Sequence, residues 1–304
     1  MNNELIENVV VNDKTYKFVS KYKRNDFLRK EFNKLTTECF EFDLEDFYKQ
    51  GYWDDTYTPY SIIDDNRIVA NVSVADFDFT INQVTVKCVQ IATVMTTKTY
   101  RKKGLCRFLI EKVILEWKDR SDLVYLFANG SVTKMYPRFG FYLEKEFVCS
   151  KQITKTTKKS NIIKLDMDNT NDRYFIIDMI KNSACIAEFA SLNTLSMLIF
   201  YCTTSHKDHI YYLKDINAII IVERKDRTIY LYDIFSRKHI EMEDVINSMN
   251  TDDTDRIVFG FTPIGKGKYA EEELKVENST LFILDDKKGI FKNRKIRFPA
   301  LTRT

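Results

Sequence analysis

The sequence predicts a mixed α/β protein of two lobes, in which the first lobe has a central mixed β-sheet flanked by helices. Segments that alternate apolar and polar residues are interspersed with segments of helical spacing, which favours mixed α/β structure over an all-α or all-β fold. The 304 residues exceed the size of a usual single core, about 100–200 residues, so two lobes are expected. With 44% apolar residues and only 8 glycines and 4 prolines, the chain is typical of a globular protein.

The first elements form a strand and two helices. Lys14–Tyr22 alternates in the manner of a strand. Asn25 is a suitable N-cap for a helix over Asp26–Phe40, because its side chain can accept from the free amides of the first turn. A second, short helix is expected over Leu44–Gln50.

An antiparallel meander follows these helices. Three β-branched segments with period two are separated by turn residues, and they comprise Pro59–Ile63, Arg67–Phe79 and Val84–Met95. After them the period changes to that of a helix over Gly104–Trp117, with apolar residues on one side.

The first lobe ends with short elements. Leu123–Phe127 is an apolar run typical of a buried strand, Ser131–Tyr136 is predicted as a short helix capped by Ser131, and Phe139–Ser150 is predicted as a hairpin-like end. The predicted order is therefore β-α-α-β-β-β-α-β-α-β.

The boundary between the lobes is predicted near residue 150. Lys151–Asn161 is polar and rich in Lys and Thr, as in a linker or an exposed edge segment. We therefore expect a first domain over residues 1–150 and a second α/β domain over residues 151–304. The elements expected in the second are helices over Asp172–Ser183, Asn193–Tyr201 and Glu241–Met249, and strands over Ile216–Val222, Thr228–Ile234, Arg256–Phe261 and Leu281–Leu284.

Charge and hydropathy exclude several classes of partner. The 47 basic and 44 acidic residues give a formal charge of +3, so the sequence lacks the cationic field that binds nucleic acid. No apolar run approaches membrane-spanning length, and the start of the chain does not resemble a secretory signal. We expect a cytoplasmic protein with neither nucleic acid nor membrane as partner.

No metal site is predicted. The six cysteines are scattered without CxxC spacing, as expected of reduced thiols. His206 and His209 form an HxxH pair, but no third ligand lies at a suitable spacing, so a solvated pair is expected.

The segment Ile91–Arg107 is suited to binding an anion. It is a strand that ends in a basic loop with a single glycine, Gly104, directly before a helix. The first turn of a helix carries unpaired amides and a positive dipole end, and glycine permits a close approach of a pyrophosphate. Countercharge would come from Arg101, Lys102, Lys103 and Arg107. From these residues alone, a solvated surface loop remains an equal alternative.

This loop resembles the R/Q-x-x-G-x-G/A loop of the GNAT N-acetyltransferase superfamily, with Arg101-Lys102-Lys103-Gly104-Leu105-Cys106 in the matching positions. Cys106 departs from the usual Gly or Ala but is also small. The resemblance implies a GNAT fold, acetyl-CoA as acyl donor, and binding of its pyrophosphate by the loop. It also implies that the backbone of Val94, Met95 and Thr96 binds the pantetheine arm.

Downstream, Met135-Tyr136-Pro137-Arg138-Phe139-Gly140-Phe141 is similar to the family's Y-x-x-x-G-F segment, which implies that Asn129 and Tyr136 lie beside the CoA thiol. A phenol with a pKa of about 10 can protonate a thiolate whose acid has a pKa of about 8.5. Tyr136 is therefore the candidate general acid. The alternative is that Tyr136 only packs against Pro137 and Phe139.

The other catalytic groups are less defined. The resemblance implies that a main-chain N–H of Met95 or Thr96 polarises the thioester carbonyl. A general base is missing, because the strand where many relatives carry Glu reads Cys88-Val89-Gln90; Asp76 or Asp78 could act only through water. A narrower resemblance, to the enhanced-intracellular-survival branch with a second degenerate GNAT lobe, implies that Thr304 acts as base through a terminal carboxylate.

Two functions remain open from the sequence. The first is an N-acetyltransferase that acts on a primary amine of a small molecule or peptide; the second is a CoA-binding regulatory or assembly protein without turnover. A homo-oligomer is an open possibility. Aromatic residues of the segment 40–60 could line the acceptor pocket or belong to the core; they are Phe42, Phe47, Tyr48, Tyr52, Trp53, Tyr57 and Tyr60. The acidic residues between them could attract a cationic amine or form a solvated face; they are Glu41, Asp43, Glu45, Asp46, Asp54 and Asp55.

Overall fold

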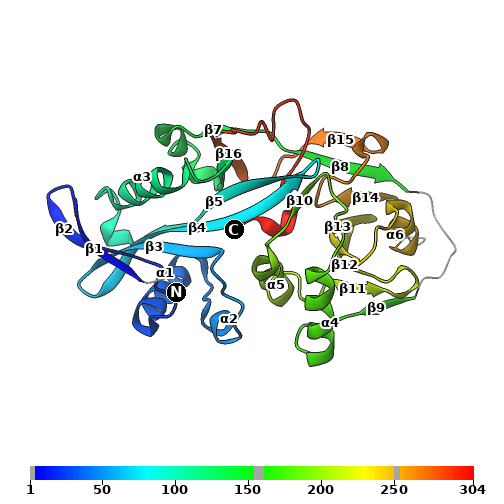
Figure 1. Ribbon diagram of the computed structural model, residues 1–304, viewed down its shortest axis with the longest axis horizontal. Coiled ribbons are helices and arrows are strands. Elements are labelled where there is room, and N and C mark those ends of the chain that lie inside the picture. The colour runs from blue at the N-terminus through cyan, green and yellow to red at the C-terminus, as the bar shows by residue number, and fades with distance from the viewer. Residues whose placement is uncertain (1–3, 154–160, 250–253) are drawn as a thin grey trace.

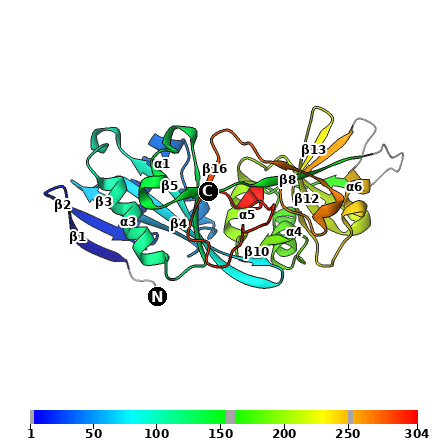
Figure 2. The same ribbon diagram turned by 90° about the horizontal axis from the view of Figure 1, so that it is seen from above.

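The computed structural model describes residues 4–153, 161–249 and 254–304. Within these ranges the chain forms two β-sheets, one in each lobe, with the C-terminus between the lobes in both views (Figures 1 and 2). The predicted mixed α/β class is confirmed. No helix of the described part is long and apolar enough to cross a membrane.

The first sheet has the strand order β1-β2-β3-β4-β5-β6-β16-β7, and β10 pairs with β4 at its side. All neighbours are antiparallel except β5 and β6. Its strands are β1 (Leu5–Val11), β2 (Lys14–Ser20), β3 (Tyr57–Asp64), β4 (Arg67–Ile81), β5 (Val84–Thr96), β6 (Leu123–Ala128), β7 (Tyr142–Leu143), β10 (Phe189–Ser191) and β16 (Thr280–Leu284).

Helices cover both faces of this sheet. The helix α3 (Leu105–Trp117) buries Leu105, Leu109 and Val113 against one face. The helix α1 (Asp26–Phe40), capped by Asn25 as predicted, buries Leu28 and Phe32 against the other. The short helix α2 (Glu45–Lys49) follows α1 and begins the segment that leads back to β3.

The second sheet has the order β15-β8-β14-β13-β12-β11-β9, in which only β13 and β14 are parallel. Its strands are β8 (Phe147–Gln152), β9 (Ile162–Lys164), β11 (Ile210–Leu213), β12 (Ala218–Lys225), β13 (Thr228–Phe235), β14 (Arg256–Phe259) and β15 (Ala270–Glu273). The helices of this lobe are α4 (Thr170–Lys181), α5 (Leu195–Thr203) and α6 (Met242–Met249).

The sheets do not divide the chain at one position. The predicted hairpin over Phe139–Ser150 is wrong, because β7 lies at the edge of the first sheet while β8 pairs with β14 and β15 in the second. Conversely, β16 returns from the second lobe and pairs with β6. Of the predicted linker Lys151–Asn161, residues 154–160 lie outside the described residues.

Candidate active site

The loop before α3 leaves the first turn of that helix open. Gly104 is the N-cap residue and adopts a left-handed backbone with a φ of 82°. No side chain of the described residues caps this turn, so its amides are free for an anion. A Cβ at residue 104 would lie 2.9 Å from Nδ2 of Asn12, which donates to the carbonyl of Lys103. Glycine is therefore required by the neighbouring hairpin β1–β2 as well.

The basic side chains around Gly104 lie on the surface. Lys102 is exposed, and the ammonium of Lys103 lies 4.4 Å from the ring centre of Tyr100. Arg107 pairs with Glu111 at 2.9 Å, and both side chains are more than half exposed. Because exposed ion pairs are weak, these cations can turn toward a bound anion at little cost.

The strand β5 separates from β6 before it reaches this loop. The two strands pair only between Cys88 and Gln90 on β5. Thr93, with a φ of 46°, lies in a bulge where the register of β4 and β5 shifts. Main-chain groups of β5 after Gln90 therefore face a gap on the β6 side. The side chain of Met95, in contrast, is buried in the cluster beneath α1.

A cavity of about 580 Å³ opens from this gap. Its walls come from β5, the end of β6, the segment from α1 to β3, α5 and the C-terminal residues. The lining residues are Phe40, Phe42, Leu44, Phe47, Trp53, Thr56, Tyr57, Phe77, Ile91, Ala92, Thr93, Val94, Phe127, Asn129, Ser131, Val132, Tyr136, Ser196, Met197, Phe200, Tyr201, Asn278, Arg303 and Thr304. The sequence-predicted residues Val94, Asn129 and Tyr136 thus meet in one cavity.

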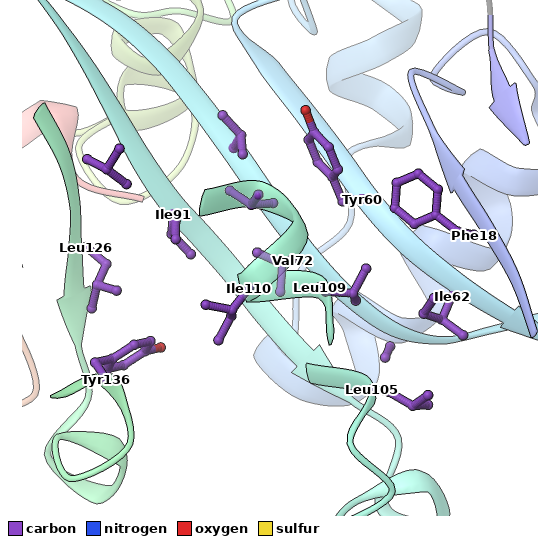
Figure 3. Close-up of a cluster of buried hydrophobic side chains, with 14 of the residues drawn as sticks. Phe18, Tyr60, Ile62, Val72, Ile91, Leu105, Leu109, Ile110, Leu126 and Tyr136 are labelled. Carbon is purple, nitrogen blue, oxygen red and sulfur yellow. The ribbon is translucent and has the colours of Figure 1, made fainter. Parts of the chain in front are cut away.

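Tyr136 belongs to the cavity wall and to the core. Its ring packs 6.1 Å from that of Phe141 and 5.9 Å from that of Phe282 on β16, and Phe139 packs against the same core. Figure 3 shows its hydroxyl pointing toward Ile110 of α3. Burial raises the pKa of Tyr136, and Cys106 adds to the rise. The phenol therefore keeps its proton at neutral pH, but the rise in pKa makes it a weaker proton donor than an ordinary tyrosine.

Cys106 packs against the same core as Tyr136. Burial raises the pKa of the Cys106 thiol to about 11, so the thiol stays neutral. The residue that departs from the family pattern is thus a small, uncharged group within the first turn of α3.

The predicted helix over Ser131–Tyr136 is wrong. The structure has two 3₁₀ turns there, over Gly130–Val132 and Tyr136–Phe139. Asn129 is the cap of the first turn, since its side chain accepts from the amide of Ser131 at 3.4 Å. The second turn starts at Tyr136 because Pro137 lacks an N–H and suits the first residues of a turn.

Gln90 was not predicted as a site residue, yet it ties the C-terminal segment to β5. With its amide oriented so that both ends have partners, it donates to the carbonyl of Thr302 at 3.0 Å and to Tyr125 Oη at 3.2 Å. It then accepts from the backbone N–H of Thr304 at 2.9 Å and from Thr304 Oγ1 at 2.7 Å. The one sequence signal was a glutamine between the apolar residues Val89 and Ile91, and the structure buries it fully. Thr304 lines the cavity, and its role as base stays a prediction.

A buried ion pair fixes the last residues further. Arg303 donates two hydrogen bonds to Glu146, at 2.8 and 2.9 Å, and its guanidinium lies 4.3 Å from the ring centre of Phe127. Glu146 also accepts from the amide of Phe298 at 2.9 Å. The pair joins residues 157 positions apart, and no sequence pattern marks it.

The candidate bases Asp76 and Asp78 do not line the cavity. Asp76 pairs with Lys87 at 3.1 Å, and burial raises the pKa of its carboxyl. The backbone amide of Asp78 donates to the side chain of Asn193 at 2.6 Å. Both residues belong to the contact between β4 and its neighbours.

The HxxH pair lies in the second lobe. The ring of His206 packs 4.5 Å from that of Tyr232, and its Nδ1 lies 2.8 Å from Ser205 Oγ. Among the residues that the structure describes, no group of three His, Cys, Asp or Glu side chains is placed to hold a metal ion.

Comparison with known proteins identifies a part of the first lobe. Residues 20–143 match the family model described as the acetyltransferase (GNAT) domain. This match includes the loop at Gly104 and the segment at Tyr136. No curated protein matches the sequence significantly.

Solved structures share the fold of both lobes. A protein from Enterococcus faecalis described as a probable N-acyltransferase has a TM-score of 0.58 at 11% identity, covering 94% of this chain and 74% of its own. GCN5-related N-acetyltransferases are similar too. That of Anabaena variabilis has a TM-score of 0.55 at 12% identity, covering 88% and 72%. That of Kribbella flavida has a TM-score of 0.53 at 11% identity, covering 93% and 72%.

Proposed function

Because residues 20–143 match the model of the acetyltransferase (GNAT) domain, we propose that this protein transfers an acetyl group from acetyl-CoA to a primary amine of a small molecule or peptide. One observation carries the proposal. The gap beside β5 and the buried phenol of Tyr136 border one cavity, and the open first turn of α3 follows the end of β5 along the chain. Together these three features correspond to the channel, the proton donor and the anion site that the transfer needs.

The loop binds the pyrophosphate of CoA. The amides of Leu105, Cys106 and Arg107 donate to its oxygens, with countercharge from Arg101, Lys102 and Lys103. The pantetheine arm runs along β5 and bonds to main-chain groups of Val94, Met95 and Thr96, with Asn129 on the opposite side of the gap. The gap is supported by the end of strand pairing at Gln90.

The acceptor amine attacks the thioester directly in a ternary complex. Its nitrogen forms a bond to the carbonyl carbon, a main-chain N–H of β5 stabilises the oxyanion, and the carbon–sulfur bond breaks. The leaving thiolate takes the proton of Tyr136. The proton that the amine nitrogen loses passes to water, and the phenolate regains a proton from water.

Turnover is the test of this function. The protein is mixed with acetyl-CoA and a set of primary amines, and release of free CoA thiol is measured together with the acetylated amine by mass spectrometry. Production of both in equal amounts supports the proposal. Binding of CoA without acetylation of any amine favours the alternative of a regulatory or assembly protein. The described residues that line the cavity include no side-chain carboxylate, which points to this alternative.

We also propose that residues 1–150 hold the cofactor site and that residues 151–304 are a degenerate GNAT-like lobe. The like order of strands around the two parallel pairs, β5 with β6 and β13 with β14, supports this assignment. A cytoplasmic location, a homo-oligomeric state and the lack of a nucleic-acid partner stay predictions from the sequence.

A further inference from the structure

One side of the cavity is an aromatic wall, defined here as Phe42, Phe47, Trp53, Tyr57 and Phe200. The ring of Phe200 on α5 meets Phe42 at 6.0 Å and Phe47 at 5.8 Å, both edge to face. Trp53 meets Tyr57 at 5.9 Å and donates from its indole nitrogen to the Tyr57 carbonyl at 3.0 Å. The rings therefore hold one another in place before any ligand binds.

The charge of the cavity is as informative as its shape. Among the described residues that line it, Arg303 has the only charged side chain, and Glu146 pairs with that guanidinium. A second ammonium group entering this cavity would therefore lose its hydration without gaining a side-chain carboxylate of the described lining residues as partner.

Acidic residues of the neighbouring segment bind other groups of the protein. Glu45 pairs with Arg29 at 2.8 Å, and Asp55 pairs with Lys23 at 2.6 Å. Asp54 accepts from the backbone amide of Thr56 at 2.9 Å. None of the six acidic residues between Glu41 and Asp55 lines the cavity, so they do not form a cation-binding subsite within it.

We propose that the acceptor is a primary amine carried on an aromatic or other apolar body, and that a polyamine is a poor acceptor. This inference rests on the proposed function. The apolar body packs on the aromatic wall, and the single amine reaches toward Val94, where β5 faces the gap. The hydroxyls nearest this route, those of Tyr57 and Thr93, lie 2.5 Å apart and satisfy each other.

Matched amines test this inference with acetyl-CoA as donor. Hexylamine and hexamethylenediamine have the same chain and differ by one ammonium, while phenethylamine and spermidine extend the comparison. We expect kcat/KM to be roughly tenfold to hundredfold higher for the two monoamines. Equal or higher values for the diamine and spermidine overturn the inference.

Variants locate the effect. Phe200→Ala and Phe47→Ala should lower kcat/KM for phenethylamine by roughly tenfold or more, and should affect methylamine little, since methylamine has no apolar body to pack on these rings. Phe27→Ala is the control, because Phe27 is an exposed phenylalanine outside the cavity. Unchanged affinity for CoA shows that each variant is folded. Equal losses for both amines in the folded variants overturn the inference.

A binding measurement separates this inference from the proposed function. Phenethylamine should quench the fluorescence of Trp53, and the signal should weaken in Phe200→Ala and vanish in Trp53→Phe. If no amine is acetylated but this quenching occurs, the proposed function fails and the ligand class stands. If there is no quenching, or if spermidine quenches at lower concentration than phenethylamine, the ligand class is overturned.

Discussion

The two lobes follow a similar chain path around a parallel pair of strands but use the gap beside that pair differently. In the first lobe, β4 and β5 are antiparallel, α3 leads to β6 parallel to β5, and β16 lies antiparallel beyond β6. In the second, β12 and β13 are antiparallel, α6 leads to β14 parallel to β13, and β8 lies antiparallel beyond β14. Each sheet is completed by a strand that is closer in sequence to the other lobe.

The two lobes differ at the start of the helix, α3 or α6, and in the gap beside the parallel pair of strands. The segment before α6, Ser236–Glu241, contains no glycine. The C-terminal segment occupies the gap that follows the end of β14. The amide of Ala300 donates to the carbonyl of Gly260 at 2.7 Å, and Arg297 donates to the carbonyl of Phe259 at 3.0 Å. Within the described residues, the glycine turn and the open gap thus occur together in the first lobe, as an anion site for a bound cofactor would require.

The largest expected effect is that of Tyr136→Phe. Loss of the proton donor should lower kcat by roughly ten- to ten-thousandfold while the affinity for acetyl-CoA stays nearly constant. Steady-state kinetics with calorimetric binding measures both. Tyr142→Phe is the control, because Tyr142 is exposed on β7. A variant at position 136 that turns over at the wild-type rate, with chemistry rate-limiting, would rule out the phenol as the acid.

Gly104→Val comes next and tests the glycine turn. A β-branched residue is strained at a φ of 82° and meets Asn12, so the amides of the first turn shift and CoA affinity should fall roughly a hundredfold. Gly51→Val is the matched control, since Gly51 has a φ of 79° and nothing within 4 Å of an added Cβ. Lys238→Val, before α6, should leave the affinity unchanged. Calorimetry that finds similar losses in all three variants would refute the role of the loop.

Asp233→Asn probes the second lobe, and its expected effect on the free energy of unfolding is smaller. Asp233 lies beside a cavity of about 280 Å³, has no ion pair within the described ranges, and burial raises its pKa from 3.8 to about 7. The folded state therefore holds the proton more tightly than the unfolded state, so this carboxyl lowers the free energy of unfolding as the pH rises from 4 to 7. The variant should gain roughly 1–2 kcal/mol at pH 8 and nothing at pH 4, as measured by urea denaturation. A gain that is equal at both pH values would contradict the buried carboxylate.

Local patterns predicted the elements on either side of the Gly104 loop, but not how the lobes combine. The helix after Gly104, the cap at Asn25 and the meander before β6 follow from period and capping, which depend on neighbouring residues. The placement of β8 and β16 depends on pairing between distant segments, for which the sequence has no local signal. The strand β1 was missed because a two-stranded hairpin at a sheet edge leaves Leu5, Ile6 and Val10 exposed, without the alternation of a half-buried strand.

The sequence predicted those site residues that belong to a continuous motif, in which the chemistry requires particular residue types at neighbouring positions. Gly104 and Tyr136 belong to such motifs, and they lie at the turn and in the cavity wall. Gln90 and the pair of Arg303 with Glu146 act through tertiary contacts with the C-terminal segment, which periodicity does not reveal. The aromatic wall was anticipated in part, since Phe42, Phe47, Trp53 and Tyr57 line the cavity, while Tyr48, Tyr52 and Tyr60 do not.

The smallest expected effect compares the two helix starts within one molecule. If the first turn of α3 binds the pyrophosphate, CoA should slow hydrogen exchange at the amides of Leu105, Cys106 and Arg107, because each donates to an oxygen anion. The first-turn amides of α6 serve as the internal control, since that helix has a similar dipole but no glycine turn before it. Exchange is followed by mass spectrometry with and without CoA, at concentrations that saturate binding. Gly104→Val should abolish the protection at α3 and leave exchange at α6 as it was. Protection that falls mainly between Ile216 and Phe259 would mean that the second lobe binds the cofactor, and the roles of the two gaps would then be reversed.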